Sequence, residues 1–188
     1  ASRTGSAADS MAGPGGTSPG VIPRVDPNAI SSSPFKRALF AFAVSKTGTW
    51  YSSRLGARID PWLLRASGGR IDHAFGQIPI VLLIVRGARS GAERTVPLLY
   101  FSDGEDVILM ASSYGRAKYP AWYYNLKANP DVRLEVRRRS APYHASEVEG
   151  PERDRLFELA KKVYPGYGEY EQRTAGVRRI PVMRLTPG

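Results

Sequence analysis

The chain has 188 residues, 42% of them hydrophobic, which is enough for one folded domain with a buried core. The absence of cysteine excludes disulfides and cysteine metal sites and fits a reducing cytoplasm; the two histidines, His73 and His144, are too few for a histidine-rich metal centre. The net charge of +10 favours an anionic ligand or surface without choosing among small molecules, nucleic acid and acidic lipid. Without cysteine and with only two histidines, the chain nearly lacks the residues from which hydrolytic catalytic sites are usually built. An enzyme of this composition would therefore depend on a cofactor.

Residues 1–33 form the first segment, which is rich in Gly, Ser, Ala and Pro and is expected to be a disordered tail. A helical segment is predicted over residues 34–70, because Ser33 and Pro34 are typical of a helix N-terminus. Within it, residues 35–58 combine an aromatic stripe with cationic side chains, as an amphipathic helix does. No apolar run in the sequence is long enough to span a bilayer.

Residues 71–188 are expected to form the folded domain, and strand patterns dominate them. The β-branched, apolar run 79–85 fits a strand buried on both faces. The remaining patterns predict strands at 94–101, 107–112, 132–137, 144–148 and 180–185, and helices at 120–129 and 151–164. This order predicts an α+β fold in which about six mostly antiparallel strands form an open sheet or a closed barrel. A Rossmann nucleotide site is not expected, because no G-x-G-x-x-G follows a strand.

The turn between the first two predicted strands has the composition of an anion site. Gly87 and Gly91 bracket it, and glycine leaves backbone N–H groups open to an incoming anion. Arg89 and Arg94 add forked donors that match phosphate or carboxylate, and Ser90 adds a hydroxyl. A hairpin with solvated arginines is the alternative interpretation of this turn.

Three stretches carry a resemblance to a known family: IPIVLLIVRGARSG at 78–91, VPLLYF at 96–101 followed by Asp103-Gly104, and PAWYYNLKANPDV at 120–132. They resemble the deazaflavin-dependent nitroreductase family of actinobacteria, and the resemblance extends from about Gly76 to the C-terminus. It implies a split β-barrel related to the flavin-binding pyridoxamine-phosphate-oxidase barrels. It also implies that coenzyme F420, a deazaflavin, is the cofactor of an oxidoreductase. The expected reaction is hydride transfer to a quinone, an enone or other activated alkene, or a nitroaromatic compound.

The resemblance implies cofactor contacts from five segments: the turn (Ala88, Arg89, Ser90), the second strand (Arg94, Thr95, Val96, Pro97, Leu98, Leu99), the end of the third strand (Met110, Ala111, Ser112, Ser113), the short helix (Ala121, Trp122, Tyr123, Tyr124, Asn125) and a later pair (Tyr164, Tyr167). The turn would lie over the coenzyme tail and the third strand would end against the ring and its phosphate. The helix N-terminus would face the anionic part. Relatives commonly have a basic residue at the position of Ala88 and a lysine at that of Ser113, which Arg116 and Lys118 are expected to replace.

The substrate side is expected to include Tyr164, Tyr167 and Tyr170, whose spacing places them on one face if the chain is helical there. In the resembling family, tyrosines at these places line the substrate pocket and act as a mobile lid, and neighbouring glycines would permit that motion. A tyrosine cluster packed on the barrel rim is the alternative. Ser112 is expected to donate a hydrogen bond to the negative charge that develops on the substrate.

Two other functions stay open: a non-catalytic barrel that holds a deazaflavin, flavin, haem or fatty acid, and an FMN-dependent oxidase. Nucleic-acid binding is not expected, because the arginine run 137–139 lacks stacking aromatics. The segment 35–58 has two interpretations: it caps one mouth of the barrel, or it lies on an anionic membrane surface, which would suit a lipid-soluble quinone. The protein is expected to be a cytoplasmic monomer or homodimer, with this peripheral membrane contact as an additional hypothesis.

Overall fold

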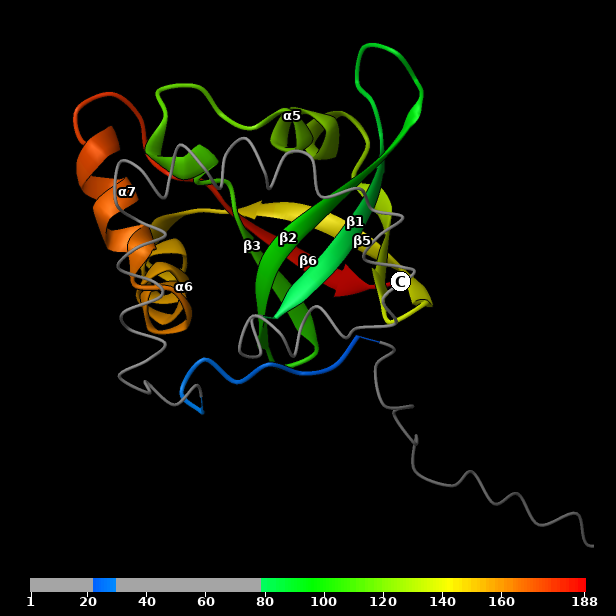
Figure 1. Ribbon diagram of the computed structural model, residues 1–188, viewed down its shortest axis with the longest axis horizontal. Coiled ribbons are helices and arrows are strands. Elements are labelled where there is room, and N and C mark those ends of the chain that lie inside the picture. Colours follow the sequence, from blue (N-terminus) through cyan, green and yellow to red (C-terminus); the bar gives the residue numbers. More distant parts are fainter. Residues whose placement is uncertain (1–21, 30–78) are drawn as a thin grey trace, which may run out of the picture.

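The computed structural model describes residues 22–29 and 79–188, whose six strands form a closed barrel in the order β1-β2-β3-β6-β5-β4 (Figure 1). The strands are β1 (Ile80–Arg86), β2 (Glu93–Asp103), β3 (Asp106–Met110), β4 (Asp131–Val136), β5 (Arg139–Val148) and β6 (Val182–Pro187). The helices of this part are the 3-10 helix η2 (Ser113–Gly115), α5 (Ala121–Ala128), α6 (Gly150–Val163) and α7 (Gly166–Thr174). Every strand pairing is antiparallel, so the predicted six-stranded α+β barrel is confirmed.

The barrel core follows from the alternation of side chains along the strands. Every second residue of each strand points inward, and β1 contributes Val81, Leu83 and Val85 to this interior. Helix α5 lies across one end of the barrel (Figure 1) and adds Trp122 and Leu126 to the same cluster. All five residues 81–85 are buried, which confirms the prediction of a strand covered on both faces.

A second hydrophobic cluster joins the outside of the barrel to α6 and α7, which lie together on one side (Figure 1). The outward faces of β2, β3 and β6 supply Phe101, Ile108 and Val182, and α6 supplies Leu156 and Phe157. The amphipathic pattern predicted for this helix is therefore confirmed, since its buried residues recur every three or four positions.

Several predicted strand boundaries differ from the structure: the second strand ends at Asp103 and not at 101, and the sixth is Val182–Pro187 and not 180–185. Two further differences have a visible cause. The third strand ends at Met110 and not at 112, because the Ser112 N–H turns back to the Met110 carbonyl at 2.9 Å. The fifth strand begins at Arg139 and not at 144, because Arg137 and Arg138 form a two-residue hairpin turn. Both have left-handed φ angles, 49° and 66°, which arginine rarely adopts, so no residue type typical of such a turn marks it in the sequence.

Residues 22–29, which belong to the stretch expected to be a disordered tail, contact the barrel. The Val25 N–H donates to Ser102 Oγ at 3.1 Å, the Ser102 N–H donates back to the Val25 carbonyl at 2.9 Å, and Tyr100 Oη donates to the Pro23 carbonyl at 2.9 Å. Ile22 joins the barrel core and is 4% exposed. These contacts make the segment a strap on the barrel. The predicted helical segment 34–70 and the predicted domain boundary at 71 lie outside the described residues.

Replacing Ile22 by alanine should destabilise the protein by about 2 kcal/mol, because an apolar side chain leaves the barrel core. Chemical denaturation measures this change. The matched control is Val177→Ala, since Val177 is 64% exposed and its truncation should leave the unfolding midpoint unchanged. Equal midpoints for the two variants would show that the strap contributes nothing to stability.

Candidate functional site

The turn after β1 is closed by its own backbone and then held by α5. The Gly91 N–H donates to the Gly87 carbonyl and the Gly87 N–H to the Ala92 carbonyl, both at 2.8 Å. A Cβ at Gly87 would lie 2.8 Å from Ser90 Oγ and 3.2 Å from the Ala92 carbonyl oxygen, so a larger residue would require the turn to shift. Asn125 of α5 accepts a hydrogen bond from the Ala88 N–H at 3.0 Å, and Asn129 donates to the Arg86 carbonyl at 3.2 Å. The two asparagines of the PAWYYNLKANP stretch therefore position the turn.

Because of these hydrogen bonds, fewer backbone N–H groups of the turn are available to bind an anion than the sequence suggests. The N–H groups of Gly87, Ala88 and Gly91 are bonded within the protein, so they are not available to a ligand. Among the described residues, the N–H groups of Arg89 and Ser90 have no acceptor, and both residues are exposed. The turn can therefore offer an anion two backbone N–H groups and the cationic side chains of Arg89 and Arg94.

Strand β2 continues beyond the end of β3 and leaves an open edge. It pairs with β1 from Glu93 to Leu99, but with β3 only from Tyr100 to Asp103. Within the described residues, one edge of the stretch 93–99 therefore has no partner strand. The predicted cofactor residues from Thr95 to Leu99 are half-buried along this edge, and most are apolar. A half-exposed apolar strip beside free backbone groups is suited to a flat, polar-edged ring.

The loop after β3, residues 111–116, contains a second set of free donors. Ser113, Tyr114 and Gly115 have consecutive left-handed φ angles of 52°, 57° and 70°, after Ser112 in the right-handed region. Among the described residues, the N–H groups of Ser113 and Tyr114 have no acceptor. Successive N–H groups in such right-to-left backbone form a concavity that binds anions. This loop therefore suits the phosphate predicted beside Ser112 and Ser113.

Arg178, which no sequence pattern had singled out, contacts this loop from the segment before β6. Its guanidinium donates to the carbonyls of Ser112 at 2.7 Å, Arg116 at 2.8 Å and Ala111 at 3.3 Å. It also lies 4.7 Å from the ring centroid of Tyr119. The contact depends on β3 pairing with β6, which is distant in sequence, so only the folded barrel reveals it.

The predicted tyrosines come together beside η2. Tyr167 and Tyr170 lie in α7, and Tyr164 lies just before it, with its hydroxyl 3.2 Å from that of Tyr170. The Tyr164 and Tyr167 rings meet edge to face with centroids 5.2 Å apart, and Tyr114 of η2 meets Tyr170 at 6.4 Å. Tyr167 and Tyr170 are buried, as the packed-cluster alternative describes, whereas Tyr164 and Tyr114 keep exposed surface. The lid motion stays a prediction.

Burial raises the pKa of Tyr164, Tyr167 and Tyr114 above the ordinary value for tyrosine, and for Tyr164 the hydrogen bond with Tyr170 adds to this effect. These hydroxyls therefore stay protonated at neutral pH. They can donate hydrogen bonds to a bound acceptor, and none of them serves as an anionic base.

Stability should fall above pH 10 because of these buried hydroxyls. Unfolded tyrosines lose their proton near pH 10, whereas folded Tyr164 and Tyr167 keep theirs, so high pH favours unfolding. The free energy of unfolding should drop by about 1.4 kcal/mol per pH unit for each such tyrosine and stay unaffected by them below pH 9. Urea denaturation between pH 8 and 11.5 measures the slope. Tyr167→Phe should make it shallower, and an unchanged slope would contradict the assignment.

The predicted helix residues divide between the core and the surface. Trp122, predicted as a cofactor contact, has its side chain in the barrel core at 6% exposure, which agrees with a packing role. Tyr123 donates to Glu147 at 2.9 Å, and burial followed by this hydrogen bond raises its pKa to about 12. Tyr124 is 51% exposed. Of these three aromatic side chains, Tyr124 is therefore the most accessible to a ligand.

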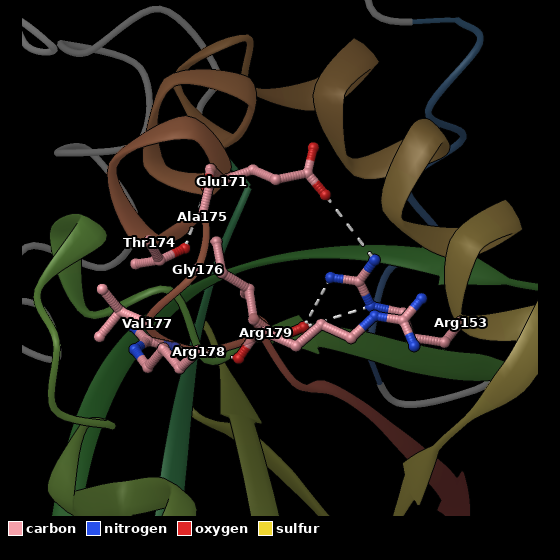
Figure 2. Close-up of a pocket in the computed structure, with 9 residues that line it drawn as sticks. Arg153, Glu171, Thr174, Ala175, Gly176, Val177, Arg178 and Arg179 are labelled. Atoms are coloured by element: carbon pink, nitrogen blue, oxygen red, sulfur yellow. Dashed lines mark hydrogen bonds and ion pairs between the residues drawn. The ribbon is translucent and has the colours of Figure 1, made fainter.

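A shallow pocket is lined by α6, by α7 and by the chain leading to β6, which includes Arg178 (Figure 2). Its polar lining includes Arg153, Glu171 and Thr174. Within residues 22–29 and 79–188, no group of acidic or histidine side chains could hold a metal ion. No helix of that same part is long and apolar enough to cross a membrane.

Comparison with known proteins gives one matching family and several relatives. The family described as F420H(2)-dependent quinone reductase matches residues 56–187 of this chain. An F420H(2)-dependent quinone reductase of Mycobacterium tuberculosis is 35% identical over 144 residues, which are 73% of this chain and 95% of the relative.

Two solved structures are similar in both sequence and fold. The F420-H2-dependent reductase FDR-A is 41% identical, with a TM-score of 0.52, and the match covers 57% of this chain and 93% of that one. A structure described as a domain-swapped dimer is 34% identical, also with a TM-score of 0.52, over 66% of this chain and 96% of that one. The barrel described above is therefore the fold that FDR-A and this second structure share.

Proposed function

The chain belongs to the F420H(2)-dependent quinone reductase family, and on this basis we propose that it is an enzyme that reduces quinones with reduced coenzyme F420. The family match carries the proposal. The barrel supports it with three features: the open edge of β2, the turn after β1 at one end of this edge and the loop after β3. All three offer backbone donors without a protein partner among the described residues.

The donor set fits an anionic deazaflavin. We assign the cofactor tail to the N–H groups of Arg89 and Ser90 with the guanidinium groups of Arg89 and Arg94. The phosphate is assigned to the N–H groups of Ser113 and Tyr114, and the ring to the half-buried strip that contains Pro97. The departures from the family pattern at Ala88 and Ser113 lie where these backbone donors can serve in place of lysine side chains.

The chain's part in the reaction is to bind, orient and exclude water. Reduced F420, when bound, supplies a hydride to the acceptor. Tyr114 lies in the loop after β3, and the rings of both Tyr114 and Tyr164 contact the ring of Tyr170. Because both keep exposed surface, we assign them to the wall of the acceptor pocket. The acceptor oxygen gains negative charge as it is reduced, and the hydroxyl groups of Ser112 and Tyr164 are assigned as hydrogen-bond donors to it. Because the raised pKa keeps Tyr164 protonated, it remains a donor at neutral pH.

Titration of the purified protein with F420, FMN and FAD, followed by fluorescence, tests the cofactor. We expect F420 to bind far more tightly than either flavin, and Arg89→Gln to weaken it, whereas Arg139→Gln on the β4–β5 hairpin should have no effect. Tight FMN binding without an F420 response would identify a flavin protein instead. Turnover of reduced F420 with menadione then separates an enzyme from a non-catalytic carrier.

We propose further hydride acceptors on the basis of the same chemistry. Enones, other activated alkenes and nitroaromatic compounds accept a hydride as quinones do, so we expect slower turnover with them. A steady-state comparison with menadione measures the preference. Faster reduction of a nitroaromatic than of any quinone would overturn the order proposed here.

We also propose that the protein is cytoplasmic and contacts the inner face of the membrane peripherally. The net charge of +10 and the amphipathic pattern of residues 35–58 support this, because both favour an anionic lipid surface. Co-sedimentation with anionic liposomes should occur at low salt and weaken as salt is added. A protein that stays in the supernatant at low salt would remove the proposal.

A further inference from the structure

We infer that Arg178 is a positioning residue: it holds the loop 111–116 in the backbone shape that turns its N–H groups toward the cofactor phosphate. The inference rests on the proposed function, since the loop is a binding loop only if a phosphate is bound there. It goes beyond the residues that the resemblance assigned, because Arg178 comes from the segment before β6 and not from any of the five predicted segments.

The hydrogen bonds of Arg178 fix the orientation of a particular peptide group. Its Nη2 donates to the Ser112 carbonyl at 2.7 Å. In a trans peptide the carbonyl and the following N–H point in opposite directions, so the Ser113 N–H must point away from Arg178. That N–H is one of the two free donors of the loop. The guanidinium therefore sets the direction of a donor that it does not touch.

The loop needs such support because its backbone is strained. Left-handed φ angles at Ser113 and Tyr114 cost roughly 1–2 kcal/mol each for residues other than glycine. Conformations of this kind persist only where the surroundings fix them. Helix α7 supports one side, since a Cβ added at Gly115 would lie 3.2 Å from the Tyr170 Cα. Arg178 supports the other side through the carbonyls of Ala111, Ser112 and Arg116.

The geometry requires a guanidinium and not merely a positive charge. One planar group binds three carbonyls of the loop and the Tyr119 ring, with Nε directed to Arg116 and the two terminal nitrogens to Ala111 and Ser112. A lysine ammonium is a point donor without this fork and cannot reproduce the set. Lysine at position 178 would therefore keep the positive charge but could not form the same set of hydrogen bonds to the three loop carbonyls.

The neighbouring arginine provides a matched control. Figure 2 shows the two side chains leaving the chain in different directions, with Arg179 directed toward Arg153 and Arg178 away from it. Arg179 is exposed and pairs with Asp154 at 2.5 Å, on the α6 side of the segment. Arg179→Lys thus makes the same chemical change one residue away without touching the loop.

The test compares Arg178→Lys, Arg178→Ala and Arg179→Lys by F420 fluorescence titration and by menadione turnover. We expect Arg178→Lys to raise the F420 Kd and KM about tenfold while kcat at saturating cofactor stays within about twofold, because one oriented donor is lost. Added guanidinium ion should partly restore F420 binding to Arg178→Ala. Arg179→Lys should behave as the wild type. Wild-type F420 affinity in Arg178→Lys would overturn the inference, and so would a loss shared equally by Arg179→Lys.

Amide hydrogen exchange keeps the inference separate from the proposed function. Gly115 and Arg116 donate their N–H groups to the carbonyls of Ser112 and Ser113 at 3.0 and 3.1 Å. Arg178→Lys should speed exchange at these two amides by more than fivefold, with or without cofactor, and Arg179→Lys should not. If the wild type binds no F420, the proposed function fails while this measurement still decides whether Arg178 holds the loop. Unchanged exchange in Arg178→Lys would overturn that role. If Arg178→Ala does not fold, Arg178→Lys alone decides.

Discussion

Replacing Asn125 by alanine should weaken F420 binding about tenfold, because the turn after β1 loses the side chain that positions it. Asn125 Oδ1 accepts the Ala88 N–H at 3.0 Å, and the next two residues carry the free N–H groups assigned to the cofactor tail. Without this hydrogen bond the turn samples other conformations, and ordering it on binding costs free energy. Fluorescence titration with F420 measures the change in Kd.

Asn28→Ala is the matched control for this change. Asn28 also uses its side-chain oxygen as an acceptor, from Lys162 at 2.8 Å, but it lies in the strap and not in the cofactor turn. It should leave the F420 Kd unchanged, with any effect confined to thermal stability. If Asn125→Ala binds F420 as tightly as Asn28→Ala, the turn does not depend on α5.

Replacing Arg153 by methionine should destabilise the protein by about 3 kcal/mol, since a buried network loses its central donor. Arg153 is 5% exposed and donates Nε and Nη2 to the Ile180 carbonyl at 3.3 and 2.8 Å. Its guanidinium also lies 4.3 Å from the Phe157 ring centroid and donates to Asp154 at 3.0 Å. Methionine fills much of the space but leaves the Ile180 carbonyl without its donor. Urea denaturation at neutral pH measures the loss.

The control lies one half-turn further along α6. Arg155 pairs with Glu152 and Asp103, both at 2.7 Å, but its side chain is 48% exposed. Arg155→Met should therefore cost less than about 1 kcal/mol, as exposed ion pairs generally do. Similar losses in the two variants would mean that the burial of Arg153 adds nothing to its contribution.

The elements that sequence reasoning located are those whose signal is local. The continuous apolar run of β1, the hairpin at Gly104 and the amphipathic pattern of α6 each lie within one element, and each was predicted close to its observed position. The start of β5 was missed because arginines occupy the two left-handed positions of its turn. The closure of the barrel depends on the pairing of β1 with β4 and of β3 with β6, which no local pattern encodes.

The same distinction holds for the candidate site. The PAWYYNLKANP stretch predicted a site in this region, and that site stays a prediction. The sequence could not show that the side chains of Asn125 and Asn129 bind the turn after β1. Nor could it show that Arg178 reaches the loop 111–116, since the two are more than 60 residues apart and meet only in the closed barrel. Contacts between a side chain and a backbone group that is distant in sequence produce no periodic pattern from which they could be predicted.

The strap, residues 22–29, affects the order in which the parts of the barrel form during folding. Its hydrogen bond from Val25 to Ser102 spans 77 residues, whereas β1 and β2 meet through a short turn. The entropy of closing a long loop must be overcome before its contacts form, so local hairpins assemble first and the strap docks afterwards. The few contacts that hold it also open without unfolding the sheet. We therefore expect the strap to dock late in folding, and the bonded Val25 amide to exchange with solvent sooner than the paired amides of the barrel strands.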